Sequence, residues 1–232
     1  MKTAECGGET RQQETREDAM QLIGMLDSPY VRRVAVALIV AKIPFEHRPI
    51  SLFRHLDAFS ALNPLLKAPT LVADQGVVLM DSSVILDWLA GGHPSLAALN
   101  PAQPAERLRA ARIAGVALTV MEKAVQQHYE RSLRSPETRN FPWMERVMRQ
   151  LEAGLSALDA ELPRVGWTGP NLGIADISAA CALGFVATVL SEPVDLGRYP
   201  NLAEFSSRAE ALPAFRAAPP RDGVTAPVEF AG

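Results

Sequence analysis

The sequence predicts a small α/β domain followed by a larger domain made only of helices. Apolar runs of strand length, joined by turn residues, are confined to the chain before residue 81. Apolar residues at helical spacing dominate from residue 105 onward, and a break at Gly91–Pro94 separates the two patterns. With 232 residues, the chain suffices for one large domain or two small ones.

The first part of the chain predicts a polar leader and then alternating strands and helices. Residues 1–19 contain almost no apolar side chains, so we expect a disordered leader that is neither a signal peptide nor a membrane span. A first strand is expected within residues 20–25, and Pro29 then opens a helix. A second strand over 46–50 and a short helix or helical loop over 53–62 follow.

One stretch combines a proline, a hairpin and a helix start. The apolar runs 70–73 and 77–80 are separated by Asp74-Gln75-Gly76, which is typical of a β-hairpin. Asp81-Ser82-Ser83 are residue types that cap helices, and a helical pattern follows to Leu89. The predicted order is β-α-β-α-β-β-α, with the first two strands parallel and the last two antiparallel.

The rest of the chain shows only helical patterns. After a linker at residues 93–104, helices are expected over residues 105–132, 141–162, 174–190 and 200–211. Leu108 and Trp143 are among the residues expected to face the core, and the third of these helices is apolar enough to be buried all round. The predicted domains are therefore 20–92 and 105–232, the second ending in a loose tail.

Composition limits the classes of partner. The net charge is −3, hydrophobic residues make up 48% and charged residues 21%, which gives no electrostatic case for nucleic acid or an anionic membrane. No uninterrupted apolar run reaches the length of about 18 residues that a membrane span needs. The two cysteines, Cys6 and Cys181, lie far apart in dissimilar segments, so we expect a reducing, cytoplasmic location.

Ser28 and Pro69 each allow two interpretations. Ser28 either only caps the helix that Pro29 opens, or uses the positive end of the helix dipole to stabilise an anion. Pro69 is either an ordinary trans proline at a strand edge or a cis proline that turns the preceding backbone toward a ligand. Asp176, inside an apolar helix, is expected to cap its own helix. The four histidines have no metal-ligand spacing, and no phosphate-binding loop is present.

Four motifs in this order resemble the cytosolic glutathione transferase family over about residues 20–217. They are Ser28-Pro29-Tyr30 with Arg33, Lys67-Ala68-Pro69, Asp81-Ser82 and Gly173-Ile174-Ala175-Asp176. Two departures accompany the likeness: the family more often has Glu where this chain has Asp81, and Ser or Thr where it has Gly173. Serine rather than cysteine at position 28 cannot form a mixed disulfide and argues against a glutaredoxin-like variant.

The resemblance implies a thioredoxin-like domain that binds glutathione as co-substrate, with a cis Pro69 and no metal. The Ala68 backbone would meet the cysteinyl part, Asp81 and Ser82 the γ-glutamyl end, and Lys67, with Arg54 or His55, the glycyl carboxylate. Ser28 would donate to the thiolate, and Tyr30 is the next candidate for that role.

The resemblance also implies a hydrophobic-substrate site and a homodimer. The site would be formed by one helix, at Met121, Val125, His128 and Tyr129. The expected activity is the addition of glutathione to a small electrophile. Two alternatives stay open: a non-catalytic binding or scaffold protein, and a glutathione-dependent isomerase or dehalogenase of the same fold.

Overall fold

The computed structural model describes residues 20–73, 76–162, 171–192, 194–221 and 223–227. The predicted leader, residues 1–19, lies outside the described residues, as do Asp74 and Gln75 of the predicted turn. In the part of the chain that is described, no helix has the combination of length and apolar character that crossing a membrane requires.

The N-terminal domain is built on a four-stranded mixed sheet of order β2-β1-β3-β4. Its strands are β1 (Gln21–Ile23), β2 (Glu46–Arg48), β3 (Thr70–Val72) and β4 (Val78–Leu79). β1 and β2 are parallel and β3 and β4 are antiparallel, as predicted, and β3 also pairs antiparallel with β1. The strands are shorter than expected, and β1 ends at Ile23, immediately before Gly24, whose φ of +133° leaves the extended region.

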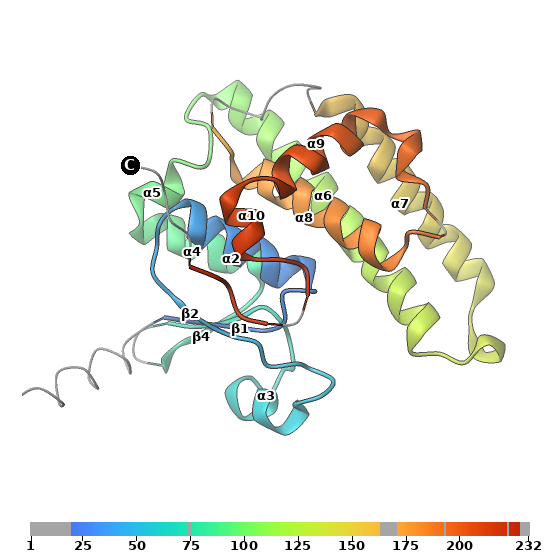
Figure 1. The fold of residues 1–232 in the computed structure, drawn as a ribbon, viewed down its shortest axis with the longest axis horizontal. Coiled ribbons are helices and arrows are strands. Elements are labelled where there is room, and N and C mark those ends of the chain that lie inside the picture. Colours follow the sequence, from blue (N-terminus) through green and yellow to red (C-terminus); the bar gives the residue numbers. More distant parts are fainter. Residues whose placement is uncertain (1–19, 74–75, 163–170, 193, 222, 228–232) are drawn as a thin grey trace, which may run out of the picture.

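Three helices complete this domain. α2 (Pro29–Val40) and α4 (Ser82–Gly92) lie between the sheet and the helical domain, whereas α3 (Leu56–Leu62) covers the other face (Figure 1). The element order β-α-β-α-β-β-α is therefore the predicted one. The stretch expected as a linker includes a short helix, α5 (Pro94–Ala97).

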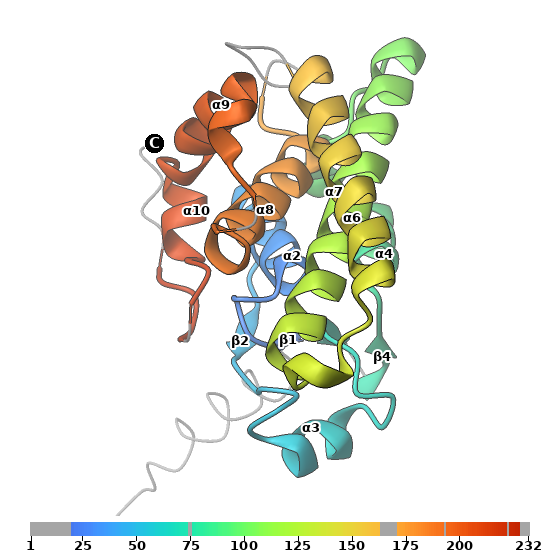
Figure 2. The same ribbon diagram turned by 90° about the vertical axis from the view of Figure 1, so that its right-hand side faces the viewer.

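The C-terminal domain is helical, with α8 at its centre. It contains α6 (Pro104–Ser132), α7 (Phe141–Glu161), α8 (Ile174–Val189), α9 (Pro200–Glu210) and α10 (Pro213–Ala217), with short 3-10 turns at Pro136–Thr138 and Leu196–Arg198. Residues 175–186 of α8 are all buried, as the apolar sequence predicted. Figure 2 shows why: α6 lies on one side of α8 and α9 and α10 on the other, and α2 also packs against α8.

Asp176 holds the start of α8. Its Oδ2 accepts the N–H of Gly173 at 2.8 Å, and the Asp176 side chain is fully buried. Gly173 has no side chain with which to return the bond, so one half of the capping box is present. The predicted capping role of Asp176 is confirmed by this contact.

Two side chains that were expected in the core are exposed. Leu108 is 74% exposed on α6 and Trp143 is 43% exposed on α7, so both predictions were wrong. Neighbouring residues at the same level are buried, Ala110 on α6 and Met144 on α7, so Leu108 and Trp143 lie on outward faces of helices that are packed there. The apolar pattern alone does not reveal which of several apolar faces packs against a neighbouring helix.

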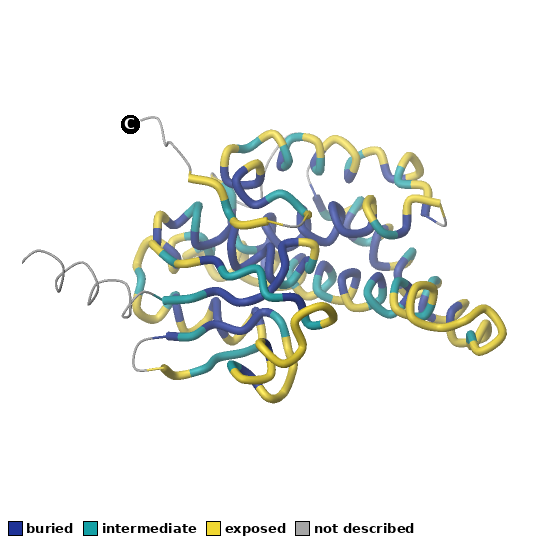
Figure 3. Tube along the Cα trace, turned by 60° about the horizontal axis from the view of Figure 1, so that its bottom comes forward, coloured by how far each residue is buried: buried dark blue, intermediate teal, exposed yellow. Residues whose placement is uncertain are grey.

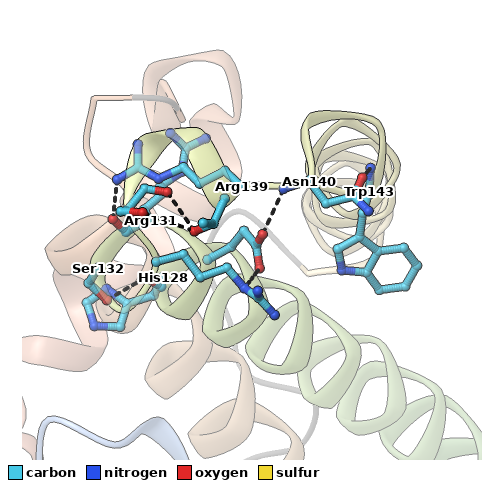
Figure 4. Close-up of polar contacts among 10 residues, drawn as sticks. His128, Arg131, Ser132, Arg139, Asn140 and Trp143 are labelled. Carbon is cyan, nitrogen blue, oxygen red and sulfur yellow. Dashed lines mark hydrogen bonds and ion pairs between the residues drawn. The ribbon is translucent and has the colours of Figure 1, made fainter.

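The connection between α6 and α7 is mostly exposed and is held by polar contacts (Figures 3 and 4). Arg139 donates to the Arg131 carbonyl at 2.6 Å, and the Asn140 N–H donates to Glu130 at 2.9 Å. Asn140 in turn caps α7 by accepting the N–H of Trp143 at 3.1 Å. This end of the molecule is therefore fixed by hydrogen bonds rather than by core packing.

A buried arginine joins the two domains. Arg32 of α2 is 1% exposed and makes a bidentate ion pair with Glu210 of α9, at 2.6 Å for both bonds. Its Nε donates to the Ala218 carbonyl at 2.7 Å, and its guanidinium lies 5.2 Å from the centre of the Phe215 ring. Burial alone lowers the pKa of Arg32, but the hydrogen bonds to Glu210 raise it above its ordinary value. This contact fixes α2, and with it the N-terminus of α2, against the helical domain.

Candidate functional site

A cavity of about 460 Å³ lies between the two domains. We call it the interdomain cavity. One wall comes from the N-terminal domain and the other from α6. Its lining residues are Tyr30, Lys67, Ala68, Pro69, Asp81, Ser82, Ser83, Leu118, Thr119, Glu122, Val125 and Gln126.

The N-terminal wall brings together the second and third sequence motifs. The peptide bond between Ala68 and Pro69 is cis, the isomer that the resemblance implied. Thr70, the first residue of β3, is fixed beside this bond: its hydroxyl donates to the Lys67 carbonyl at 2.6 Å and accepts from Asn63 at 2.8 Å. These contacts hold the segment that carries Lys67, Ala68 and Pro69 at the rim of the sheet.

The N-terminus of α4 also belongs to the N-terminal wall of the interdomain cavity. Asp81 is its N-cap, and Asp81 Oδ1 accepts the N–H groups of Ser83 at 2.9 Å and Val84 at 3.3 Å. Ser82 is 1% exposed, whereas Ser83 and Asp81 are exposed. The free N–H groups and the dipole of a helix start favour a negatively charged ligand group.

Arg33 contacts the N-terminus of α4 from the interior of the protein. It projects from α2, is 3% exposed, and its Nη1 donates to the Ser82 hydroxyl at 3.0 Å and to the Ser83 hydroxyl at 3.1 Å. Burial lowers the pKa of Arg33 from its ordinary value. The sequence motif included Arg33 without assigning it a role, and only the packing of α2 against α4 reveals these contacts.

Ser28 is placed as the N-cap of α2. Its Oγ accepts the Val31 N–H at 3.5 Å, and Ser28 is half-buried. A Cβ built on Gly24, in the same loop, would come within 3.2 Å of Ala68 Cβ, so this loop runs close to the Ala68 segment. A hydroxyl that accepts one bond keeps its O–H for another acceptor. Ser28 is outside the lining of the interdomain cavity, so its catalytic role stays a prediction.

Tyr30 does line the interdomain cavity. Burial, together with the negative charge of Glu122, raises the pKa of its phenol to about 12. The phenol is therefore protonated at neutral pH and is available as a hydrogen-bond donor. Its elevated pKa makes it a weaker donor to a thiolate than an unperturbed tyrosine.

Arg54 and His55 are not brought into the interdomain cavity. They lie in the loop before α3, where the Ser51 N–H donates to His55 Nδ1 at 3.2 Å and Arg54 contacts the Met25 sulfur at 4.0 Å. Lys67 does line the cavity, so of the three groups expected to meet the glycyl carboxylate it is the one placed there.

The four predicted hydrophobic-substrate residues lie in three places. Val125 lines the interdomain cavity, but Met121 is fully buried and belongs to the core. His128 and Tyr129 lie further along α6, outside the cavity lining. Their rings contact Phe185, 6.1 Å from His128, and Phe53, 5.8 Å from Tyr129.

The face of α6 that lines the interdomain cavity differs from the predicted one. It carries Leu118, Thr119, Glu122, Val125 and Gln126, which recur at helical spacing. Met121 lies on the adjacent, inward stripe, where its apolar side chain is buried. The apolar periodicity predicted the helix itself. The stripe of α6 that lines the cavity mixes polar and apolar residues, so its sequence did not indicate that it faces a cavity.

Two family models match the chain and show the class of protein. The model of the glutathione S-transferase N-terminal domain matches residues 22–101, and that of the C-terminal domain matches residues 141–208. A maleylpyruvate isomerase of a Ralstonia species is 30% identical over 212 residues, covering 87% of this chain and 97% of that protein. The chain belongs to the glutathione S-transferase family.

Individual relatives within the family differ in the activity that their names state. A maleylacetoacetate isomerase of Pseudomonas aeruginosa is 29% identical over 200 residues, covering 81% of this chain and 90% of the relative. A solved glutathione S-transferase of Methylobacterium radiotolerans, in complex with glutathione sulfonate, is 31% identical with a TM-score of 0.81. That comparison covers 91% of this chain and 99% of the solved one. Family members use glutathione as co-substrate, and solved neighbours contain it or a derivative.

No group of three or more His, Cys, Asp or Glu side chains lies close enough to hold a metal ion in the part of the chain that the structure describes.

Proposed function

We propose that this protein adds the thiolate of glutathione to a small, neutral electrophile in the interdomain cavity. The observation that carries the proposal is that the interdomain cavity has one wall rich in polar groups, from the N-terminal domain, and one wall with apolar side chains, from α6. The N-terminal wall offers Lys67, the Ala68 backbone and the start of α4, which suit the charged tripeptide. The α6 wall offers Leu118 and Val125 beside that site, which suit an apolar co-substrate.

Charge in the cavity favours conjugation of a neutral electrophile over isomerisation of a dicarboxylate. Among the described lining residues Lys67 is the one cation, whereas Asp81 and Glu122 are acidic. Glu122 lies on α6, on the side assigned to the co-substrate, and it is close enough to Tyr30 to raise the pKa of the phenol. Glu122 is paired with Lys123 at 3.0 Å, which offsets part of its charge, but a dianionic substrate would still find Lys67, the one cation among the described lining residues, already used by glutathione.

Ser28 is proposed as the residue that activates the thiol. A free thiol has a pKa near 8.5, so little thiolate exists at neutral pH. A hydroxyl at the N-terminus of α2 would donate to the developing thiolate, and the helix dipole would add to the effect. The sulfur then attacks the electrophilic carbon and the leaving group departs, while the thiol proton passes to solvent.

Conjugation of chlorodinitrobenzene with Ser28→Ala beside the wild type tests this function. The rate should fall about 10- to 1000-fold, because one donor to a developing anion is lost, while glutathione affinity stays within a few-fold. The pKa of bound glutathione, followed by thiolate absorbance, should rise toward its free value. A wild-type rate and thiol pKa in Ser28→Ala would reduce Ser28 to a helix cap and make Tyr30→Phe the next variant to assay.

Isomerase activity is the second candidate, and the names of two relatives favour it. It predicts glutathione-dependent cis-trans isomerisation of maleylpyruvate or maleylacetoacetate with no consumption of glutathione. Turnover of these acids faster than conjugation of any neutral electrophile would overturn the conjugation proposal. Retention on immobilised glutathione with neither activity would favour the non-catalytic alternative.

A homodimer and a cytoplasmic location remain part of the proposal. The homodimer is expected from the resemblance, and the cytoplasmic location from the sparse, separated cysteines. Light scattering in solution and cell fractionation test them directly.

A further inference from the structure

Arg33 is a buried cation whose charge no carboxylate in the described part of the chain neutralises through an ion pair. Its Nη1 bonds the two serine hydroxyls, and its Nε has no partner. The neighbouring Arg32 is a useful contrast, because its guanidinium is just as buried but is paired with Glu210. Consecutive helix residues point about 100° apart, so Arg32 faces the helical domain and Arg33 faces α4.

The Arg33 guanidinium lies at the start of α4, an 11-residue helix whose first residues line the interdomain cavity. Ser82 and Ser83, the two residues that Arg33 bonds, both line that cavity. The positive end of the α4 dipole and the Arg33 guanidinium therefore act at the same place. The Asp81 carboxylate is near enough to raise the pKa of Arg33 but makes no ion pair with it, so part of the cost of burying the charge remains and an anionic ligand group at this place would lower it.

The hydroxyl geometry also points toward a ligand. Arg33 donates to the oxygen of each serine, which occupies a lone pair and leaves the hydroxyl proton to be donated elsewhere. Hydrogen bonds in such a chain polarise one another, so a hydroxyl held by a guanidinium is a stronger donor to an anion. A carboxylate in the cavity would accept these protons and face the guanidinium through them.

We propose that Arg33 is a positioning residue for the α-carboxylate of the γ-glutamyl end of glutathione. It acts through Ser82 and Ser83, orienting their hydroxyl protons toward the cavity and supplying the positive charge behind them. The inference rests on the proposed function, since it assumes that glutathione occupies the interdomain cavity.

The test compares two ligands on one variant. Glutathione and an analogue whose γ-glutamyl group is replaced by γ-aminobutyryl differ only in the α-carboxylate. Arg33→Gln should weaken glutathione binding on the order of ten- to a hundredfold, the value of a charge-assisted contact, and change binding of the analogue by less than about twofold. The KM for glutathione should rise with kcat little changed, and Arg33→Lys should recover part of the loss.

Arg112→Gln is the matched control. Arg112 is an exposed arginine of α6 that pairs with Glu161 and is not part of the lining of the interdomain cavity, so this variant removes the same charge from the protein outside the site. It should leave both affinities unchanged. The unfolding midpoint of unliganded Arg33→Gln should equal or exceed that of the wild type, because a buried charge that no ion pair neutralises has been removed.

Three outcomes would overturn the inference. Equal loss of affinity for both ligands would assign Arg33 a merely structural role and leave the proposed function intact. Wild-type protein that binds neither ligand would overturn the proposed function and this inference with it. If Arg33→Gln does not fold, Ser83→Ala replaces it, since Ser83 is exposed. Equal affinity of Ser83→Ala and wild type for glutathione would then refute the proposal.

Discussion

The ion pair between Arg32 and Glu210 predicts an asymmetric response to removing its partners. Arg32 is 1% exposed at its side chain and Glu210 is 35% exposed. Glu210→Ala leaves a guanidinium buried without a counter-charge, whereas Arg32→Met leaves a carboxylate that still reaches water. We therefore expect Glu210→Ala to be the more destabilising of the two substitutions.

The structure sets the size of each effect. Breaking a buried pair by removing one partner costs about 3–5 kcal/mol, and this range applies to Glu210→Ala. Arg32→Met loses the bonds to Glu210 and to the Ala218 carbonyl and the contact with Phe215. Because Glu210 can be rehydrated, we expect a smaller cost of about 1–3 kcal/mol. The double variant leaves no buried charge and should cost less than the sum of the two single ones.

Urea unfolding followed by circular dichroism measures these differences, and thermal unfolding checks them. For a chain of this size, about 3–5 kcal/mol corresponds to a fall of roughly 6–20 °C in the unfolding midpoint. Arg112→Met, which breaks an exposed pair with Glu161, is the control and should cost at most about 1 kcal/mol. Equal losses for Glu210→Ala and Arg32→Met, or additive losses in the double variant, would refute the argument from burial.

Three further predictions follow from single contacts. Asp176→Ala should lower the free energy of unfolding by about 1–3 kcal/mol, because the buried N–H of Gly173 loses its acceptor; an unchanged urea midpoint would contradict the capping role. Burial lowers the pKa of His47, whose Nδ1 accepts the Thr225 N–H at 3.2 Å, so His47 favours folding above its unfolded pKa of about 6.5. Stability should fall as the pH drops below that value, less so in His47→Gln, and identical pH profiles for the two proteins would exclude this linkage. Gly154→Ala places a Cβ 2.7 Å from a side chain of α6, so it should lower the free energy of unfolding by about 1–3 kcal/mol. Thermal unfolding measures this loss, and an unchanged midpoint would mean that α6 can move away from α7 without cost.

The fold was largely predictable because its signals are local. Pro29, the hairpin residues and the Asp81 cap each specify an element through backbone chemistry, and the unbroken apolar run of α8 specifies a buried helix. The segment containing the cis Pro69 and the start of α4 also came from sequence, because both motifs lie within one stretch of about 20 residues, and consecutive elements joined by short connections usually lie side by side.

The tertiary structure decided which face of each helix is buried in the core and which lines the site. Met121 and Val125 are both apolar residues of α6, yet one is buried in the core and the other lines the interdomain cavity. Arg32 and Arg33 are identical neighbours in sequence, yet one is paired with Glu210 across the domain interface and the other bonds the start of α4. Local sequence sets the type of element, but the partner of a side chain depends on what packs against that element, and those contacts join residues far apart in the chain.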